Sequence, residues 1–282
     1  MKKLAERLIG KKVSGIKPAG GGCIAEAVVL TMENGLKYFV KKYTGSFAEE
    51  TVKAEVTGLE EIEKSKTIRT PKVIASEGSA IVLEYIQTGE AKKDFWEVFG
   101  QKLAQMHRMV SEKGHGFHSD NFIGATPQKN IPFNPSWSEF FINNRMVPQF
   151  SLMKRNGYYT PDFSHKVERF LEKLPDLFED ENTPPSLLHG DLWSGNFMIS
   201  AEGEAVIFDP AVYYGDRETD LAMARLFGGF SERFYAAYAE SYPLNPGWQE
   251  REIVYQIYHR VNHVNLFGSG YLGGVVSALN YF

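Results

Sequence analysis

The stretch HGDLWSGN, residues 189–196, and the motif VIFDP that follows it decide the fold of this chain. Asp191 is a candidate general base, and Asn196 and Asp209 are candidate metal ligands. Between these two ligand candidates lie two short apolar runs, at 197–199 and 205–208. The runs predict a hairpin that brings Asp209 back beside Asn196.

The spacing within this stretch carries the chemical information. In kinase catalytic loops an Asp takes the proton of the attacking hydroxyl, an Asn five residues later holds magnesium, and a second Asp holds magnesium beneath the phosphates. Any one such residue in a Gly-containing turn is more often a turn or cap residue, because Asp and Asn side chains bond nearby backbone groups. The joint pattern is much rarer, so it predicts phosphoryl transfer.

The composition is typical of a globular protein. The chain has 282 residues, 43% hydrophobic and 23% charged, which is long enough for two lobes. A formal net charge of -4 argues against nucleic acid or an anionic membrane as partners. The start, MKKLAERLIGKKV, lacks an apolar run of signal-peptide length, and no segment is apolar enough to span a membrane. With a single cysteine, Cys23, these features predict a cytoplasmic protein.

Residues 1 to about 86 combine strand signals with one helix. The segment 49–64 is rich in helix formers and carries apolar residues at helical spacing. Strand signals occur at 28–30, 38–40, 73–75 and 80–86. This pattern predicts a small β-rich lobe.

The pattern changes to helices after Tyr85. Apolar residues recur at three- and four-residue steps between Phe95 and Val110, and again between Ile253 and Val264. Between these helices lies a long irregular stretch, 114–137, which is either functional or disordered. Its four aromatic side chains favour the ordered case.

Three glycines at 20–22 precede the first strand run. Their backbone N–H groups are able to approach phosphate oxygens closely, although a plain turn is the commoner use of such glycines. The Walker pattern G-x-x-x-x-G-K-[ST] is absent from the sequence, which disfavours a P-loop NTPase.

Lys41 and Lys42 end the second strand run, where a kinase N-terminal lobe carries its nucleotide-binding lysine. Because side chains alternate along a strand, only one of the two faces a cleft. The expected partner is a glutamate of the following helix. Glu55 is the best candidate, and its competitors are Glu49, Glu50 and Glu60.

In this order, the segments resemble the protein-kinase-like small-molecule kinases, and more closely the fructosamine kinase (ketosamine-3-kinase) family. The resemblance spans nearly the whole chain, through GGGCIAEA (20–27), FVK (39–41), GFHSDNFIGATPQ (116–128), LLHGDLWSGN (187–196), VIFDPAVYYGDRETDLAMARLFGGF (206–230) and YQIYHRVNHVNLFG (255–268). It implies an α+β, protein-kinase-like bilobal fold. Residues 1–86 would form a small β-rich nucleotide-binding lobe with one helix, and residues 87–282 a larger, mostly helical lobe for catalysis and substrate binding.

The resemblance also implies roles for single residues. It selects Lys41 and Glu55 as the pair that binds ATP, and Asp191 as the base. Other implied roles are nucleotide binding for Gly21, Gly22 and the backbone of Glu84 and Ile86, magnesium binding for Asn196 and Asp209, enclosure of the sugar for Trp193 and His263, and a structural brace for Asp220. For His118 and Asn121, substrate contact and organisation of their own loop both stay open.

The activity implied by the resemblance is transfer of the ATP γ-phosphoryl group, with Mg²⁺, to the 3-hydroxyl of a ketosamine. The acceptor would be a ribulosamine, erythrulosamine or fructosamine, free or on a glycated protein lysine, which implies protein repair by deglycation. Pro210 stands where protein kinases carry Phe-Gly, and no activation segment ending in A-P-E follows, so a small-molecule acceptor and a constitutively assembled site are favoured. The alternatives are an aminoglycoside or choline kinase and a nucleotide-binding pseudokinase scaffold.

Cys23 directly follows the glycine turn. A free cysteine is commonly a small buried hydrophobe. The resemblance adds a redox role, because relatives with a cysteine in this loop can form an intermolecular disulfide. With one cysteine, oxidation has to link two chains or add a small thiol. A monomer and a redox-linked homodimer therefore both stay open.

Overall fold

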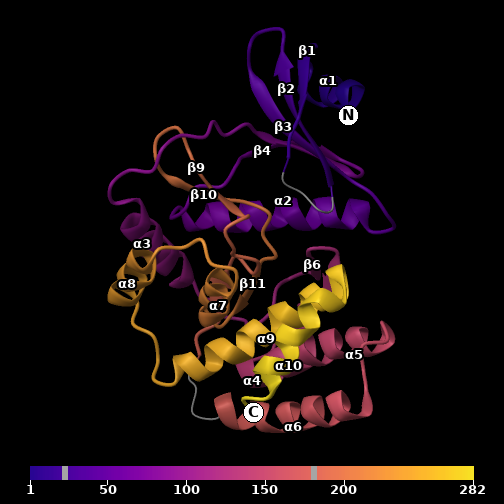
Figure 1. Cartoon of the computed structure of the whole chain (residues 1–282). Coiled ribbons are helices and arrows are strands. Elements are labelled where there is room, and N and C mark those ends of the chain that lie inside the picture. Colours follow the sequence, from indigo (N-terminus) through magenta and orange to yellow (C-terminus); the bar gives the residue numbers. More distant parts are fainter. Residues whose placement is uncertain (21–24, 179–182) are drawn as a thin grey trace.

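The structure, a computed structural model, describes residues 1–20, 25–178 and 183–282. The predicted glycine positions Gly21 and Gly22, and Cys23, lie outside the described residues. Figure 1 shows a sheet crossed by one long helix at one end of the molecule and a larger, mostly helical part at the other. The α+β class is therefore confirmed.

The N-terminal part is built on a five-stranded antiparallel sheet of order β1-β2-β3-β5-β4. The strand signals at 28–30 and 38–40 belong to β2 and β3, which form a hairpin in which Val28 pairs with Val40 and Gly35 closes the turn at φ 80°. The strands are β1 (Val13–Pro18), β2 (Ala25–Met32), β3 (Lys37–Tyr43), β4 (Val73–Glu77) and β5 (Ala80–Glu84).

The two faces of this sheet pack against different helices. Because successive residues of a strand point to opposite faces, Val82 packs with Ala5 of α1 (Lys2–Ile9), whereas Ile81 packs with Leu59 of α2 (Ala48–Ser65). The helix predicted at 49–64 is α2. The sequence prediction of a single helix in this lobe was wrong, because α1 is also present. Its eight residues are too few for a periodic pattern read over 11 or more residues.

The C-terminal part is mostly helical, as predicted. The periodic segment that begins at Phe95 contains α3, and the periodic segment that ends at Val264 lies within α9. None of the helices in the described ranges is long and apolar enough to cross a lipid bilayer. The helices are α3 (Phe95–His107), α4 (Trp137–Phe141), α5 (Val147–Arg155), α6 (Pro161–Phe178), α7 (Glu218–Leu226), α8 (Glu232–Ser241), α9 (Trp248–Phe267) and α10 (Leu272–Leu279), with a π-helix η1 (Ile142–Met146) and a 3-10 helix η2 (Ser269–Tyr271).

In the part of the chain that the structure describes, three two-stranded sheets lie between these helices. The stretch 114–137 is ordered, because Phe117 and Trp137 are buried in the core and one of the sheets lies within it. The sheets pair β6 (Asn121–Ile123) with β7 (Thr126–Gln128), β8 (Ser186–Leu188) with β11 (Tyr213–Gly215), and β9 (Phe197–Ile199) with β10 (Ala205–Ile207). The pairs β6–β7 and β9–β10 are hairpins, whereas β8 and β11 are separated in the chain by β9 and β10.

His115 makes the stability of this fold depend on pH. Its ring lies 5.2 Å from that of Trp137, its Nδ1 has no hydrogen-bond partner among the described residues, and burial lowers its pKa to about 4. In the unfolded chain the pKa of a histidine is about 6.5, so between these values the unfolded state binds more protons and stability falls as the pH falls. Lowering the pH from 7.5 to 5 should therefore cost the wild type about 2 kcal/mol of unfolding free energy that His115→Phe does not lose, because the variant lacks the titrating ring.

Urea unfolding of both proteins at the two pH values measures this gain. His165→Phe, at an exposed position of α6, is the control and should follow the wild-type pH dependence. Parallel pH profiles for wild type and His115→Phe would contradict the assignment of a neutral, buried His115.

Candidate active site

The HGDLWSGN stretch forms a loop between β8 and β9 that is fixed from two sides. The backbone N–H groups of His189 and Gly190 donate to the carboxylate of Asp220 at 2.7 and 2.8 Å. Gly190 has φ 81°, and a Cβ there would lie 2.1 Å from the carbonyl oxygen of Ala211. Only glycine fits this position, because it tolerates the positive φ and lets the backbone pass close to Ala211 just before Asp191.

Asp220, on α7, is buried and holds the loop as an ionised group. Burial by itself raises the pKa of its carboxyl, but hydrogen bonds from His107 and from the His189 backbone, with the charge of His107, lower the pKa below its usual value. His107 Nε2 lies 3.2 Å from Asp220 Oδ2. This geometry supports the structural brace proposed for Asp220.

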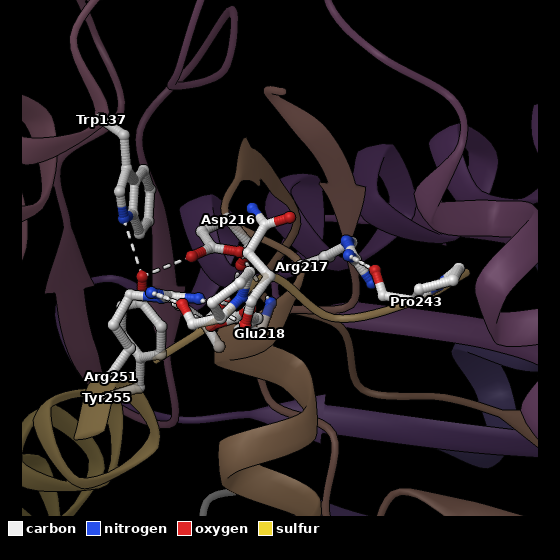
Figure 2. Close-up of polar contacts among 10 residues, drawn as sticks. Trp137, Asp216, Arg217, Glu218, Pro243, Arg251 and Tyr255 are labelled. Atoms are coloured by element: carbon white, nitrogen blue, oxygen red, sulfur yellow. Dashed lines mark hydrogen bonds and ion pairs between the residues drawn. The ribbon is translucent and has the colours of Figure 1, made fainter. Parts of the chain in front are cut away.

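A buried polar network, which was not predicted from the sequence, anchors the start of α7. Arg251 of α9 donates to both carboxylate oxygens of Glu218, at 2.9 and 3.0 Å. Tyr255 donates to Asp216 and accepts from Trp137 Nε1 at 2.9 Å. Figure 2 shows the network, whose labelled members are Trp137, Asp216, Arg217, Glu218, Pro243, Arg251 and Tyr255. Paired charges such as these are costly to break, so the network keeps α7, and with it Asp220, in position.

Asp191 and Asn196 are joined directly. Asn196 Nδ2 donates to the carbonyl oxygen of Asp191 at 2.8 Å and to its Oδ2 at 3.1 Å, which leaves the amide oxygen of Asn196 for another partner. Burial raises the pKa of Asp191 to about 7; the bond from Asn196 opposes this rise, and the charge of Asp209 adds to it. A near-neutral pKa suits a base that accepts a proton at neutral pH.

Lys41, and not Lys42, points into the protein. Lys41 is 7% exposed and lies on the α2 side of β3, with Nζ 2.8 Å from Glu55 Oε1 and bonded to the Asp209 carboxylate. Burial lowers the pKa of Lys41, but the charges of Glu55 and Asp209 outweigh it and raise the pKa above its usual value. Lys42 is exposed, as are the competing glutamates Glu49, Glu50 and Glu60.

The predicted hairpin returns Asp209 to the loop. β9 pairs with β10, and the Phe208 N–H donates to the Asn196 carbonyl at 3.0 Å. Asp209 follows at φ 56°, a left-handed conformation that non-glycine residues rarely adopt and that is common at functional sites. In this conformation its carboxylate meets Lys41, so the hairpin brings the two halves of the site together.

Helix α2 contacts the segment after Asp209 at Gly58, one turn beyond Glu55. A Cβ on Gly58 would lie 2.9 Å from Pro210 Cγ and 3.3 Å from Val212 Cγ2. Glycine inside a helix costs about 1 kcal/mol relative to alanine. The close approach of Pro210 accounts for glycine at this point, and it couples the position of Glu55 to that of Asp209.

The oxygens of Asn196 and Asp209 fit a magnesium ion that arrives with a nucleotide. Among the described residues there is no group of three or more His, Cys, Asp or Glu side chains that could hold a metal. Mg²⁺ typically uses one or two protein oxygen ligands, and waters and substrate phosphates complete its octahedron. The donor set therefore suits Mg²⁺ shared with phosphates better than a metal held by protein alone.

The segment between β5 and α3 is hydrogen-bonded to the β9–β10 hairpin. Gly89 N–H donates to the Ile199 carbonyl at 3.1 Å, and Ala201 N–H donates to the Gln87 carbonyl at 2.7 Å. Glu84 ends β5, and Ile86 is buried just after it. The N–H of Glu84 donates to the Lys72 carbonyl at 2.8 Å.

Trp193 and His263 share one surface. The ring of Trp193 lies 6.3 Å from that of Phe227, and the ring of Phe227 lies 4.6 Å from that of His263. Phe227 therefore connects Trp193 and His263, the two residues expected to enclose the sugar. Trp193 lies two positions beyond Asp191 in the chain. Phe227 was not predicted from the sequence; its signal there is an aromatic residue directly before Gly228 and Gly229.

Asn121 and His118 do not share this surface. The amide of Asn121 is buried and hydrogen-bonded at both ends: Nδ2 donates to the Val212 carbonyl at 2.7 Å, and Oδ1 accepts from Gln128 and Asn130, both at 2.9 Å. This placement supports the loop-organising role and not substrate contact. His118 is exposed, and its ring lies 4.0 Å from that of Phe117.

Comparisons with known proteins identify relatives of this chain. The sequence profile of the fructosamine kinase family matches residues 1–281. A protein from Synechocystis sp. designated a ketoamine kinase is 42% identical over 259 residues, which cover 90% of this chain and 85% of that protein. A chloroplastic protein-ribulosamine 3-kinase from Oryza sativa subsp. indica is 38% identical over 275 residues, which cover 95% and 79%.

A crystal structure assigned as a fructosamine-3-kinase of Thermobifida fusca superposes with a TM-score of 0.90 at 30% identity, covering 99% of this chain and 97% of that one. The protein-kinase-like fold expected from the sequence is thereby confirmed. With a family match across almost the whole length and relatives above 30% identity, the chain belongs to the fructosamine kinase family.

Proposed function

We propose that this protein transfers the γ-phosphoryl group of ATP to the 3-hydroxyl of ketosamines. The observation that carries the proposal is the convergence of the bonded pair Asp191–Asn196 with Asp209 and the ion pair Lys41–Glu55. These are the parts that phosphoryl transfer requires. The family match, and relatives named ketoamine kinase and ribulosamine 3-kinase, support the acceptor class.

In this proposal each side chain has one task. Lys41, oriented by Glu55, binds nucleotide phosphates, with the N–H groups of Gly21 and Gly22. Asn196 and Asp209 hold Mg²⁺, which when bound neutralises charge on the phosphates. Asp191 orients the attacking hydroxyl and accepts its proton as the new O–P bond forms and the bond to ADP breaks.

We propose that the nucleotide and the acceptor bind to different lobes. Residues 1–86 would bind the nucleotide, with the adenine edge on the backbone of Glu84 and Ile86, and residues 87–282 would bind the acceptor. The hydrogen bond from the Ile207 N–H to the Arg69 carbonyl at 3.0 Å and the ion pair of Lys41 with Asp209 join the two lobes, which supports one fixed lobe arrangement. This arrangement agrees with a site that is assembled without an activation segment.

The chemistry of the phosphorylated product indicates what the reaction is for. A ketosamine 3-phosphate carries its phosphate next to the C2 carbonyl. Loss of a C1 proton and of phosphate from C3 leaves an iminium at C1, and water adds there to release the amine. On a glycated protein this sequence returns unmodified lysine, so we propose deglycation as the role.

An acceptor panel tests the proposed function. ADP release would be measured with ribulose-lysine, erythrulose-lysine and fructose-lysine, and in parallel with kanamycin and choline. We expect turnover with ketosamines only. Turnover with kanamycin or choline would move the protein to another small-molecule kinase class, and ATP binding without any turnover would support a scaffold.

Lys41→Met tests the nucleotide site. Loss of the ammonium group should raise KM for ATP and lower kcat together, reducing kcat/KM about 100-fold or more, because the lysine contacts the phosphates in the ground state and the transition state. Lys42→Met is the matched control and should keep wild-type kinetics, since Lys42 is exposed. A loss in Lys42→Met with normal Lys41→Met kinetics would transfer the role to Lys42.

A further inference from the structure

Five aromatic rings form a continuous cluster that extends outward from the acceptor side of the site. The ring of His263 lies 5.4 Å from Phe267 and 5.2 Å from Tyr271, and Phe267 lies 6.1 Å from Tyr271. Together with the contacts of Phe227 to Trp193 and His263, these distances define an aromatic wall made of Trp193, Phe227, His263, Phe267 and Tyr271.

The wall faces solvent. Trp193 is 38% exposed, Phe227 40%, Phe267 48% and Tyr271 40%, so these rings are not part of the core. Among the described residues, the other strongly exposed aromatic side chains are Phe47 and Tyr281, and neither has a ring contact to the wall. A contiguous exposed aromatic patch beside a catalytic loop is typical of a binding surface.

The chain is folded so as to complete this wall. His263 and Phe267 lie one turn apart on α9 and share a face. Gly268 then ends α9 at φ 94°, which a residue with a side chain rarely adopts, and the short helix η2 returns Tyr271 to His263. The wall therefore has an inner part at Trp193 and His263 and an outer part at Phe267 and Tyr271.

The proposed function places the sugar at the inner part, and the chemistry of the substrate indicates what lies beyond it. In a ketosamine the sugar C1 is bonded to a secondary amine, which an aliphatic chain joins to the carrier. Such an amine is protonated at neutral pH. Aromatic faces bind both an ammonium group, by cation–π attraction, and the methylene groups next to it.

We propose that Phe267 and Tyr271 bind the amine and alkyl arm that link the ketosamine to its carrier. This inference rests on the proposed function and extends it from the sugar to the linkage. Because the outer rings are open to solvent, the far end of the arm is free to continue into a protein. The acceptor class selected by the wall is therefore a lysine-linked ketosamine, including one on a protein surface.

A comparison of two acceptors tests this selection. The first is ribulose linked to the side-chain amine of Nα-acetyl-lysine, and the second is 1-amino-1-deoxyribulose, which has the same sugar and no alkyl arm. For the double variant Phe267→Ala/Tyr271→Ala we expect kcat/KM with the lysine adduct to fall about tenfold, mainly through KM, and kcat/KM with the armless acceptor to change less than about twofold.

Two controls separate recognition from support of the fold. Tyr281→Ala removes an exposed ring outside the wall and should leave both acceptors unaffected. Phe267→Tyr/Tyr271→Phe keeps both rings and should restore the preference for the lysine adduct. An equal loss with both acceptors would show that the rings only support His263, and no loss with either would also overturn the inference. If wild type phosphorylated neither acceptor, the proposed function itself would fail.

Discussion

Replacing Asp191 with asparagine is expected to lower kcat about 1,000-fold while leaving the Kd for ATP within about threefold of wild type. The asparagine cannot accept the proton of the attacking hydroxyl. Its amide oxygen still accepts the bond that Asn196 Nδ2 donates to Asp191 Oδ2 in the wild type, so the loop should keep its shape. The loss should therefore appear in the chemical step and not in nucleotide binding.

Single-turnover phosphorylation of ribulose-lysine and calorimetric titration with ATP measure the two quantities. Asp176→Asn, on the exposed side of α6, is a matched control and should behave as wild type. Turnover by Asp191→Asn close to the wild-type rate would remove Asp191 from the role of base.

The second large effect is expected at Gly58. In Gly58→Ala the new methyl group would meet Pro210 Cγ at 2.9 Å, closer than carbon atoms pack, so α2 and the segment after Asp209 have to separate. Because Glu55 lies one turn away on α2, this separation should weaken the contact of Lys41 with Glu55 and Asp209. We expect kcat/KM for ATP to fall about tenfold or more.

Stability should change much less than activity in this variant. Overpacking costs about 1–3 kcal/mol, but alanine is favoured over glycine inside a helix by about 1 kcal/mol. Gly273→Ala in α10 is the matched control: nothing lies within 4 Å of its added Cβ, so it should keep normal kinetics.

A double-mutant cycle locates the cause at Pro210. Pro210→Ala removes the Cγ atom that lies 2.9 Å from the added methyl group. The nearest remaining atom of residue 210 is then its Cβ, at an ordinary contact distance of 3.6 Å. The variant Gly58→Ala/Pro210→Ala should therefore be more active than the product of the two single effects predicts. Strict additivity would show that Gly58 acts through some other contact.

The parts of the site that short-range spacing determines were predictable from the sequence. The step from Asp191 to Asn196 and the hairpin that returns Asp209 both follow from local patterns, and the structure contains them. Alternation along β3 placed Lys41 and Lys42 on opposite faces without choosing between them, and the family resemblance selected Lys41. In the structure Lys41 is buried and Lys42 is exposed.

The parts that depend on partners distant in the sequence were not predictable. In the sequence, Glu218 is indistinguishable from a surface charge, because its partner Arg251 lies 33 residues later. Gly58 has no evident reason in the sequence, since glycine destabilises a helix; the reason is the close contact with Pro210, which only the structure shows. Asn121 was ambiguous for the same reason, because its bonding partner Val212 belongs to another segment.

The most direct test of the central claim follows the fate of one acceptor. Wild-type protein, ATP and Mg²⁺ would be incubated with ribulose-lysine and monitored by phosphorus and proton NMR. We predict a new phosphate ester coupled to the proton on C3, which then decays as inorganic phosphate and free lysine appear in equal amounts. A phosphate ester on any other carbon, or ATP consumption with no sugar phosphate, would contradict the account.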